Sequence, residues 1–263
     1  MRTALTIAGS DPSGGAGIQA DIKTFQAHGL FGMTVITAVT VQNTQKVYNV
    51  QEITPEIVAG QILCLFDDIE IHAVKIGMVF SLILIETIAD TLKKIDLPYV
   101  ILDPVMISTS GYRLLEKDAS ESLVKTLFPV VDVITPNIYE AEAITKKKIE
   151  SVADMKKAAA ELLLLGAKKV VIKGGHLKGK LSVDVAYDGI TYQEYQNTRI
   201  ETKNTHGTGC TFSSAIAANM ADGNDFFQSV ANAKKYITGA ILNSPSIGKG
   251  HGPVNHFWNR FSS

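Results

Sequence analysis

Short apolar runs rich in β-branched residues alternate along the chain with longer segments in which apolar residues recur at helical spacing. The first run, residues 4–8, ends in the turn-rich segment 9–17, after which Ile18, Ile22 and Phe25 recur at near-helical spacing. This alternation continues through most of the chain. It predicts strands near residues 4–8, 33–41, 73–76, 99–104, 131–135 and 169–173, and helices near 18–30, 55–65, 82–94, 123–127, 151–166, 208–220 and 226–242.

Local signals mark the ends of several elements. Thr54 and Pro55 suit an N-cap and the first position of a helix, and Ser151, with Asp154 three residues later, suits a second helix start. Asp188–Gly189 is flanked by alternating apolar positions, which is typical of an antiparallel hairpin.

Repeated strand–helix units predict one α/β domain over residues 1–263, with a mostly parallel sheet, helices on both faces and the hairpin at one edge. In sheets of this class, ligands bind beyond the carboxyl ends of the strands. Asp11, Gly77, Asp103, Asn137 and Gly174 each follow a predicted strand. We therefore expect these residues to lie at one edge of the sheet.

The composition narrows the classes of function. The chain has 263 residues, 46% of them hydrophobic and 19% charged, and its 25 Lys+Arg against 26 Asp+Glu give a net charge of −1. This balance argues against a general nucleic-acid binder. No apolar stretch approaches the roughly 20 residues of a membrane-spanning helix, and the N-terminus resembles no secretion signal. We expect a soluble, cytoplasmic protein that binds neither nucleic acid nor membrane.

The segment Thr205–Phe212 carries two glycines directly before a predicted helix rich in Ala and Ser. Glycines let the backbone approach a ligand closely, and the unpaired N–H groups and dipole of a helix start attract anions, so one interpretation is a phosphate site. The other is a glycine loop that only begins a buried helix. Cys210 is either a small buried side chain or a thiol whose pKa falls at the helix start.

Three further features leave similar alternatives. Gly14–Gly17 lacks the spacing of a Walker A loop, and it is either a tight turn or room for a flat ligand. Asn137 and Glu140 lie three residues apart at a predicted helix start, where they either hold a hydrated Mg²⁺ or favour the helix dipole. Asp103 and Lys173 end predicted strands; Asp103 is expected to face the crevice, while Lys173 either contacts phosphate or points into solvent.

Together these segments resemble the hydroxymethylpyrimidine kinase and phosphomethylpyrimidine kinase family of the ribokinase-like superfamily, which serves thiamine synthesis. The resemblance extends over essentially the whole chain. Nine motifs in order carry it and make it specific: Thr6–Asp11, Gly14–Asp21, Val41–Thr44, Lys75–Met78, Asp103–Met106, Thr135–Asn137, Lys173–His176, His206–Phe212 and Gly250–His256.

The resemblance implies a ribokinase-like three-layer sandwich and an ATP-dependent kinase that uses Mg²⁺. Its small-molecule substrate would be 4-amino-5-hydroxymethyl-2-methylpyrimidine, which one site would convert first to the monophosphate and then to the diphosphate. By the same resemblance, Gln42 binds the polar edge of the pyrimidine, for which a buried amide offers both a donor and an acceptor. Asp21 would support the pocket, and its lining would be Ala16, Gly17, Met78 and Val105.

The resemblance also implies roles in phosphoryl transfer around Cys210. Relatives of this fold often carry aspartate at this position, so we expect Cys210 to take the hydroxyl proton, as a thiolate helped by the helix start. The amides of Gly207, Thr208, Gly209 and Cys210 would hold the transferring phosphoryl group.

On the nucleotide side, the resemblance implies that Lys173 meets the phosphates with Asp103 nearby, while Asn137 and Glu140 organise Mg²⁺ through water. It further implies a homodimer. The nearest alternative activity is that of a pyridoxal kinase, because family members can also phosphorylate the hydroxymethyl group of vitamin B6 forms. A catalytically silent binding protein and a sugar kinase are the remaining alternatives.

Overall fold

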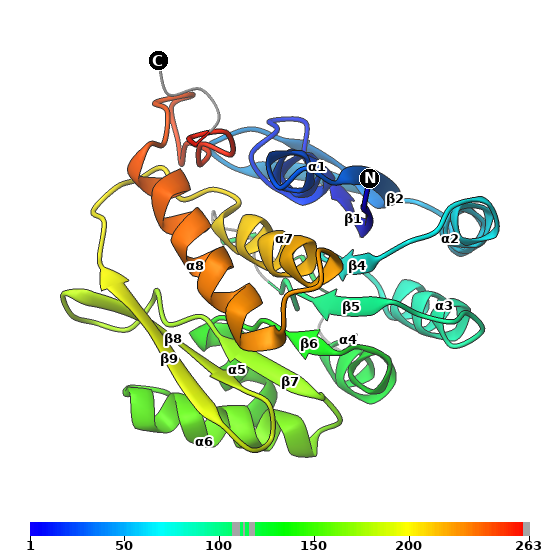
Figure 1. Ribbon diagram of the computed structural model, residues 1–263. Helices are drawn as coiled ribbons and strands as arrows, with labels where there is room; N and C mark the ends of the chain where they lie inside the picture. The colour runs from blue at the N-terminus through cyan, green and yellow to red at the C-terminus, as the bar shows by residue number, and fades with distance from the viewer. Residues whose placement is uncertain (107–110, 113, 116–118, 260–263) are drawn as a thin grey trace.

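The computed structural model describes residues 1–106, 111–112, 114–115 and 119–259. In this part of the chain, nine strands form one sheet whose six central strands run parallel (Figure 1). Antiparallel strands close both edges. In sheet order the strands are β3 (Val47–Glu52), β2 (Phe31–Gln42), β1 (Thr3–Ser10), β4 (Ala73–Ile76), β5 (Tyr99–Leu102), β6 (Val133–Ile134), β7 (Lys169–Ile172), β8 (Leu181–Tyr187) and β9 (Tyr192–Thr198).

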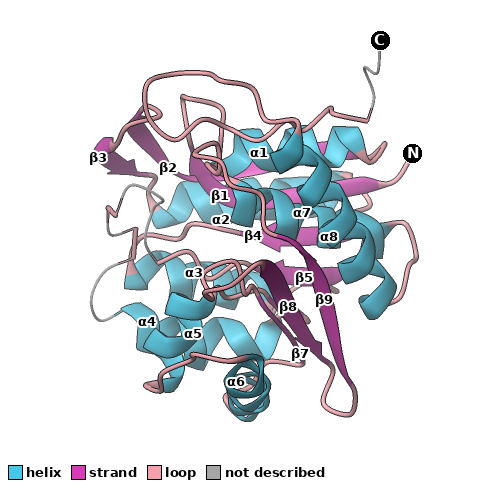
Figure 2. Ribbon diagram, turned by 90° about the vertical axis from the view of Figure 1, so that its left-hand side faces the viewer, coloured by secondary structure: helices cyan, strands magenta, loops and turns pink. Residues whose placement is uncertain are grey.

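Helices cover both faces of the sheet, which confirms the predicted three layers (Figure 2). One core lies beneath α2 (Pro55–Asp68), α3 (Leu82–Leu92), α5 (Ile138–Thr145) and α6 (Val152–Leu164), and it includes residues of α4 (Ala119–Ser122). The other lies beneath α1 (Gly17–Ala27), α7 (Thr208–Ala221) and α8 (Phe226–Leu242). Successive residues of a strand supply the two cores alternately: Val100 and Leu102 of β5 join the first, and Ile101 joins the second.

The hairpin predicted around Asp188–Gly189 is confirmed as β8 and β9, but the antiparallel strand at the opposite edge was missed. β3 pairs with β2, and its register shifts between Val41 and Gln42. Most of β3 is exposed or half-buried, so its sequence lacks the apolar alternation that identifies a strand with one buried face. The edge position therefore explains why pattern analysis failed here.

Several predicted helix boundaries agree closely with the structure. The Ser151 hydroxyl accepts a hydrogen bond from Asp154 N–H as an N-cap, whereas Thr54 caps α2 without such a bond. α1 ends at Ala27, earlier than predicted, and Gly29 follows with a φ of +82°. The predicted helix at 123–127 is a wide π-helical turn that continues α4.

The strand ends that the sequence placed at one edge of the sheet do lie together. The parallel strands β1, β4, β5, β6 and β7 point the same way, so the residues that follow them share one edge, where α1 and α7 also begin. No helix in the described part of the chain has the length and apolar character needed to cross a membrane.

Candidate active site

Two glycine segments far apart in the sequence are in direct backbone contact. A Cβ at Gly207 would lie 1.7 Å from the carbonyl oxygen of Gly15, and a Cβ at Gly15 would lie 2.3 Å from the ring of His206. Gly207 also has a φ of +77°, which favours glycine. These three constraints bring the loop before α7 against the loop before α1.

The first turn of α7 presents backbone amides at this junction. The second and third residues of a helix have no acceptor within it, so the N–H groups of Gly209 and Cys210 are available to an anion. Thr208 N–H already donates to Thr205 O at 3.2 Å. A Cβ at Gly209 would lie 3.3 Å from both Asp103 Oδ2 and Lys173 Nζ, so the helix start faces that pair.

Cys210 lies half-buried in this turn, and the backbone N–H of Gly17 at the start of α1 lowers the pKa of its thiol. Burial raises the pKa of the thiol to about 11, against the attraction of Lys75, and the carboxylates of Asp21 and Asp103 raise it further. This shift is opposite to the fall predicted from the helix start. The sequence did not reveal how many negative charges surround the sulfur.

Asp103 and Lys173 form an ion pair at the ends of β5 and β7. Lys173 Nζ lies 2.5 Å from Asp103 Oδ1, which also accepts a hydrogen bond from Thr135 Oγ1 at 3.3 Å. Although burial lowers the pKa of Lys173, the carboxylates of Asp103 and Glu140 hold it above its usual range. Lys173 therefore points to the crevice and not to solvent, and it stays charged there.

The loop after Lys173 is fixed by a second buried ion pair. Lys234 Nζ of α8 lies 2.8 Å from Asp184 Oδ2 of β8, and Asp184 Oδ1 accepts a hydrogen bond from Gly174 N–H at 2.9 Å. A Cβ at Gly174 would lie 1.8 Å from Val183 O, so this position has no space for a side chain. The edge hairpin thus positions the backbone that carries Lys173.

Asn137 and Glu140 bind each other's backbone in a capping box at the start of α5. Glu140 N–H donates to Asn137 Oδ1 at 3.0 Å, and Asn137 N–H donates to Glu140 Oε2 at 2.7 Å. Met106 N–H also donates to Glu140. Burial raises the pKa of Glu140 to about 7, although the Lys173 ammonium opposes this.

These contacts limit how the site can hold Mg²⁺. Backbone N–H groups already donate to Asn137 Oδ1 and Glu140 Oε2, and the described residues contain no group of three His, Cys, Asp or Glu side chains suited to a metal. Mg²⁺ usually keeps several waters and takes few carboxylates besides substrate phosphates. The residues therefore fit contact through water, while direct ligation by a protein cage does not fit.

Gln42 lies at the end of β2, next to the loop that precedes α7. Its side-chain nitrogen is 3.3 Å from His206 Nε2, and its Oε1 accepts a hydrogen bond from Thr40 Oγ1 at 3.2 Å. His206 Nε2–H also donates to Asp11 Oδ2 at 2.7 Å. Gln42 therefore lies beside the loop that leads into the first turn of α7.

The other residues expected around the pyrimidine lie near this end of the sheet. Met78 packs in a small apolar cluster with Ala38 and Leu114, and Val105 lies against it. Ala16 N–H donates to Asp11 Oδ2 at 2.9 Å, which fixes the loop that leads into α1. Asp21 is fully buried, and the contacts described for it are with protein groups, so it supports the crevice from beneath.

Sequence reasoning placed Asp11 at this edge of the sheet but assigned no role to it, to His206 or to Lys75. His206 Nε2 lies 2.7 Å from Asp11 Oδ2, and although burial raises the pKa of Asp11, hydrogen bonds from His206 and Ser13 hold it below its usual range. Lys75 is fully buried beside Asp21. A lysine inside an apolar strand pattern was the available signal, because buried charges are retained only with partners.

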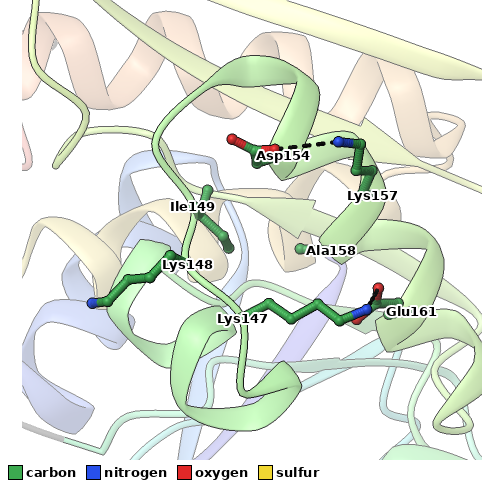
Figure 3. Close-up of a pocket in the computed structure, with 7 residues that line it drawn as sticks. All are labelled: Lys147, Lys148, Ile149, Asp154, Lys157, Ala158 and Glu161. Carbon is green, nitrogen blue, oxygen red and sulfur yellow. Dashed lines mark hydrogen bonds and ion pairs between the residues drawn. The ribbon is translucent and has the colours of Figure 1, made fainter.

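A separate pocket of about 200 Å³ lies between the loop residues 147–149 and α6 (Figure 3). Its lysines face acidic side chains: Lys147 pairs with Glu161, and Lys157 Nζ lies 3.5 Å from Asp154 Oδ1. All four side chains are exposed or partly exposed. The pocket is thus surrounded by surface ion pairs, and none of the candidate active-site residues lines it.

The phosphomethylpyrimidine kinase family matches residues 11–255. The chain belongs to this family. Membership confirms the resemblance drawn from the nine motifs, together with the kinase class and ribokinase-like fold that it implied.

Individual relatives agree with this result. The chain is 46% identical over 248 residues to the hydroxymethylpyrimidine/phosphomethylpyrimidine kinase of Aquifex aeolicus, with 94% of this chain and 97% of the relative covered. It is also 46% identical over 252 residues to the thiamine biosynthesis bifunctional protein ThiED of Geobacter sulfurreducens; 96% of this chain is covered, but it spans only 51% of that protein. An ADP complex of Bacillus subtilis pyridoxal kinase superposes with a TM-score of 0.92 at 39% identity, with 99% of both chains covered.

The contact between Gly207 and Gly15 is tested by Gly207→Ala, with Gly223→Ala as the matched control. Both glycines have positive φ, but a Cβ at Gly223 meets nothing within 4 Å. Gly223→Ala should lower the free energy of unfolding by about 1–2 kcal/mol, which is the cost of holding a residue with a side chain in the left-handed backbone region. Gly207→Ala should cost more and abolish nucleotide binding, because the loops must separate. Equal costs in denaturant unfolding, with binding retained, would contradict the contact.

The raised pKa of Glu140 predicts a pH dependence of stability. The native state holds the proton between the ordinary pKa of 4.5 and about 7, so the free energy of unfolding should fall as pH rises through this window. Glu140→Gln keeps a side-chain oxygen for Asn137 N–H but cannot ionise. Its stability relative to the wild type should therefore rise between these pH values and level off above 7. Denaturant unfolding at several pH values measures this, and parallel curves would show that Glu140 does not titrate there.

Proposed function

We propose that this protein transfers the γ-phosphoryl group of ATP to 4-amino-5-hydroxymethyl-2-methylpyrimidine, and then a second phosphoryl group to the monophosphate. One observation carries the proposal. The unpaired amides at the start of α7 and the Gln42 amide border the same loop region, because Gln42 contacts His206 two residues before α7 begins. The names of the full-length relatives support the same substrate class.

The nucleotide phosphates are held at the start of α7 in this proposal. Amides of Gly209 and Cys210 donate to the transferring group, and Lys173 adds a positive charge that is already oriented by Asp103. Mg²⁺, held through water near Asp103 and Glu140, would neutralise phosphate charge. Positioning and charge neutralisation supply most of the rate, because phosphoryl transfer needs little covalent assistance from the protein.

Gln42 orients the acceptor. Its amide offers a donor and an acceptor to the amino group and ring nitrogen of the aminopyrimidine, while Met78 and Val105 supply apolar contact near the ring. A molecule without that polar edge leaves the amide unpaired, which costs binding free energy. This arrangement directs the hydroxymethyl group toward α7.

Cys210 takes the hydroxyl proton in this proposal. The substrate oxygen bonds to the γ-phosphorus while the bond to the β–γ bridging oxygen breaks, and the proton moves to the sulfur of the thiolate. Because the pKa of the free thiol is raised to about 11, the thiolate is a minor form at neutral pH. The rate should therefore follow the thiolate fraction.

Substitutions of Cys210 test this role. Cys210→Ala should lower kcat about 10²-fold or more with the KM for ATP little changed, because general base catalysis contributes about that much. Cys210→Asp should retain more turnover than Cys210→Ala. In the wild type kcat/KM should rise from pH 7 to 9, and in Cys210→Asp it should be flat, since a carboxylate is ionised throughout. Unaltered turnover in Cys210→Ala would eliminate the base role.

Pyridoxal kinase activity is the second candidate, favoured by the close superposition on the Bacillus subtilis enzyme. The two activities are separated by measuring ADP release with the aminopyrimidine alcohol and with pyridoxal at matched concentrations. We expect a higher kcat/KM for the aminopyrimidine, and Gln42→Leu should reduce that preference. A higher value for pyridoxal would reverse the assignment, and ligand binding without turnover of either would point to a silent binding protein.

We also propose that the protein forms a homodimer through the exposed face of β2, the strand next to the β3 edge of the sheet. Val39 and Val41 are 44% and 58% exposed at alternate positions of β2, so they form an apolar strip on one face of that strand. Sedimentation equilibrium should give twice the chain mass of 28.4 kDa, and Val41→Glu should shift it toward one chain. A single-chain mass for the wild type would contradict the dimer.

A further inference from the structure

A fully buried ion pair lies inside the sheet beneath the candidate active site. Lys75 is on β4, between β1 and β5, with no exposed surface, and Asp21 of α1 is equally buried. Burying an ammonium group is unfavourable unless it is closely paired, and both oxygens of Asp21 lie 2.9 Å from Lys75 Nζ. The proposed function gives this pair no role.

The Lys75 side chain is directed toward the active-site end of its strand. Lys75 and Gly77 are two residues apart and so face the same side of the sheet. A Cβ at Gly77 would lie 2.7 Å from Lys75 Nζ, so the ammonium occupies the space that a side chain there would take. Gly77 follows the last residue of β4, and the ammonium therefore lies close to the carboxyl edge of the sheet.

Asp21 connects this ammonium to the helix that carries Cys210. Ser214 Oγ donates to Asp21 Oδ1 at 2.7 Å, and Thr6 Oγ1 of β1 donates to Asp21 Oδ2 at 2.6 Å. Ser214 is four residues after Cys210 on α7, so the two side chains share a helix face. The ion pair is therefore attached to α7 one helical turn after Cys210, on the side of the thiol that faces the protein interior.

Charged groups from four elements act on the Cys210 thiol. Lys75 of β4 favours the thiolate, while Asp21 of α1 and Asp103 after β5 oppose it. Lys173, after β7, also interacts with the sulfur, but its ammonium is paired with Asp103 on the phosphate side. Lys75 is thus the positive charge available on the side away from the nucleotide.

We propose that Lys75 is a positioning residue for the reaction. Its ammonium stabilises the thiolate of Cys210 from the protein side. Asp21 holds this ammonium in place, and the absence of a side chain at Gly77 leaves space for it. This inference rests on the proposed function of Cys210 as the base. Lys75 keeps its proton throughout, and Cys210 alone exchanges one with the substrate hydroxyl. Asp21 holds the ammonium in place and partly offsets its charge.

Because Lys75 and Asp21 carry opposite charges, removing one or the other should shift the alkylation rate of Cys210 in opposite directions. Only the thiolate reacts with iodoacetamide, so the alkylation rate of Cys210 below its pKa reports the thiolate fraction, and it needs no turnover. The measurement uses the full chain with Cys64→Ser, because Cys64 is exposed. Lys75→Met should slow alkylation at pH 8 about tenfold, and Asp21→Asn should accelerate it about tenfold, each corresponding to roughly one pKa unit.

Two further variants separate charge from packing. Thr6→Val removes a hydrogen bond to Asp21 without changing any charge, so its alkylation rate should stay near the parent value. The double variant Asp21→Asn with Lys75→Met removes both charges, and its rate should lie between those of the single variants. Loosened packing would expose the thiol and accelerate alkylation in every variant.

The outcomes are decisive for Lys75. Slower alkylation in Lys75→Met with faster alkylation in Asp21→Asn supports the proposal, and shifts of the same sign or no shift overturn it. If Lys75→Met does not fold, Asp21→Asn decides, since a rate at or below that of the parent overturns the proposal. Failure of the proposed function would appear separately, as absence of aminopyrimidine turnover in the parent chain while the alkylation shifts persist.

Discussion

The site depends on one backbone contact, between Gly207 before α7 and Gly15 before α1. The space for a Cβ at Gly207 is occupied by the Gly15 carbonyl, so the two loops approach as closely as main chains allow. This contact brings the N-termini of two helices to the same edge of the sheet, and Gln42 adjoins it through His206. In the proposed function, anion binding and recognition of a flat alcohol are neighbouring functions for this reason.

Most of the layered fold could be predicted because buried parallel strands and amphipathic helices have distinct apolar periods. The strand β3 could not be predicted in this way, because an exposed edge strand lacks the regular alternation of apolar and polar residues. In the site, glycines and strand-end residues such as Asp103 and Lys173 were visible in the sequence. The raised pKa of Cys210 was not, because it results first from burial of the thiol and then from carboxylates on α1 and after β5, and only the tertiary structure brings these about.

Buried charge pairs hold the site in place from several directions. Asp21 with Lys75 joins α1 and β4 and reaches α7 through Ser214, and Asp184 with Lys234 joins β8 to α8. Pairs of this kind add little net stability over apolar packing, but removal of one partner alone is costly. Their value here is geometric, because each fixes a backbone segment or charge that borders the phosphate region.

The last segment of the chain completes the loop in front of α7. His206 N–H donates to Gly252 O, and the buried His256 ring lies 3.0 Å from Thr211 Oγ1. During synthesis on the ribosome, residues 205–211 therefore make these contacts only with partners that lie about 45 residues later in the chain. A nascent chain that has not yet reached residues 252–256 has all the sheet strands, but its loop 205–211 lacks both of these contacts.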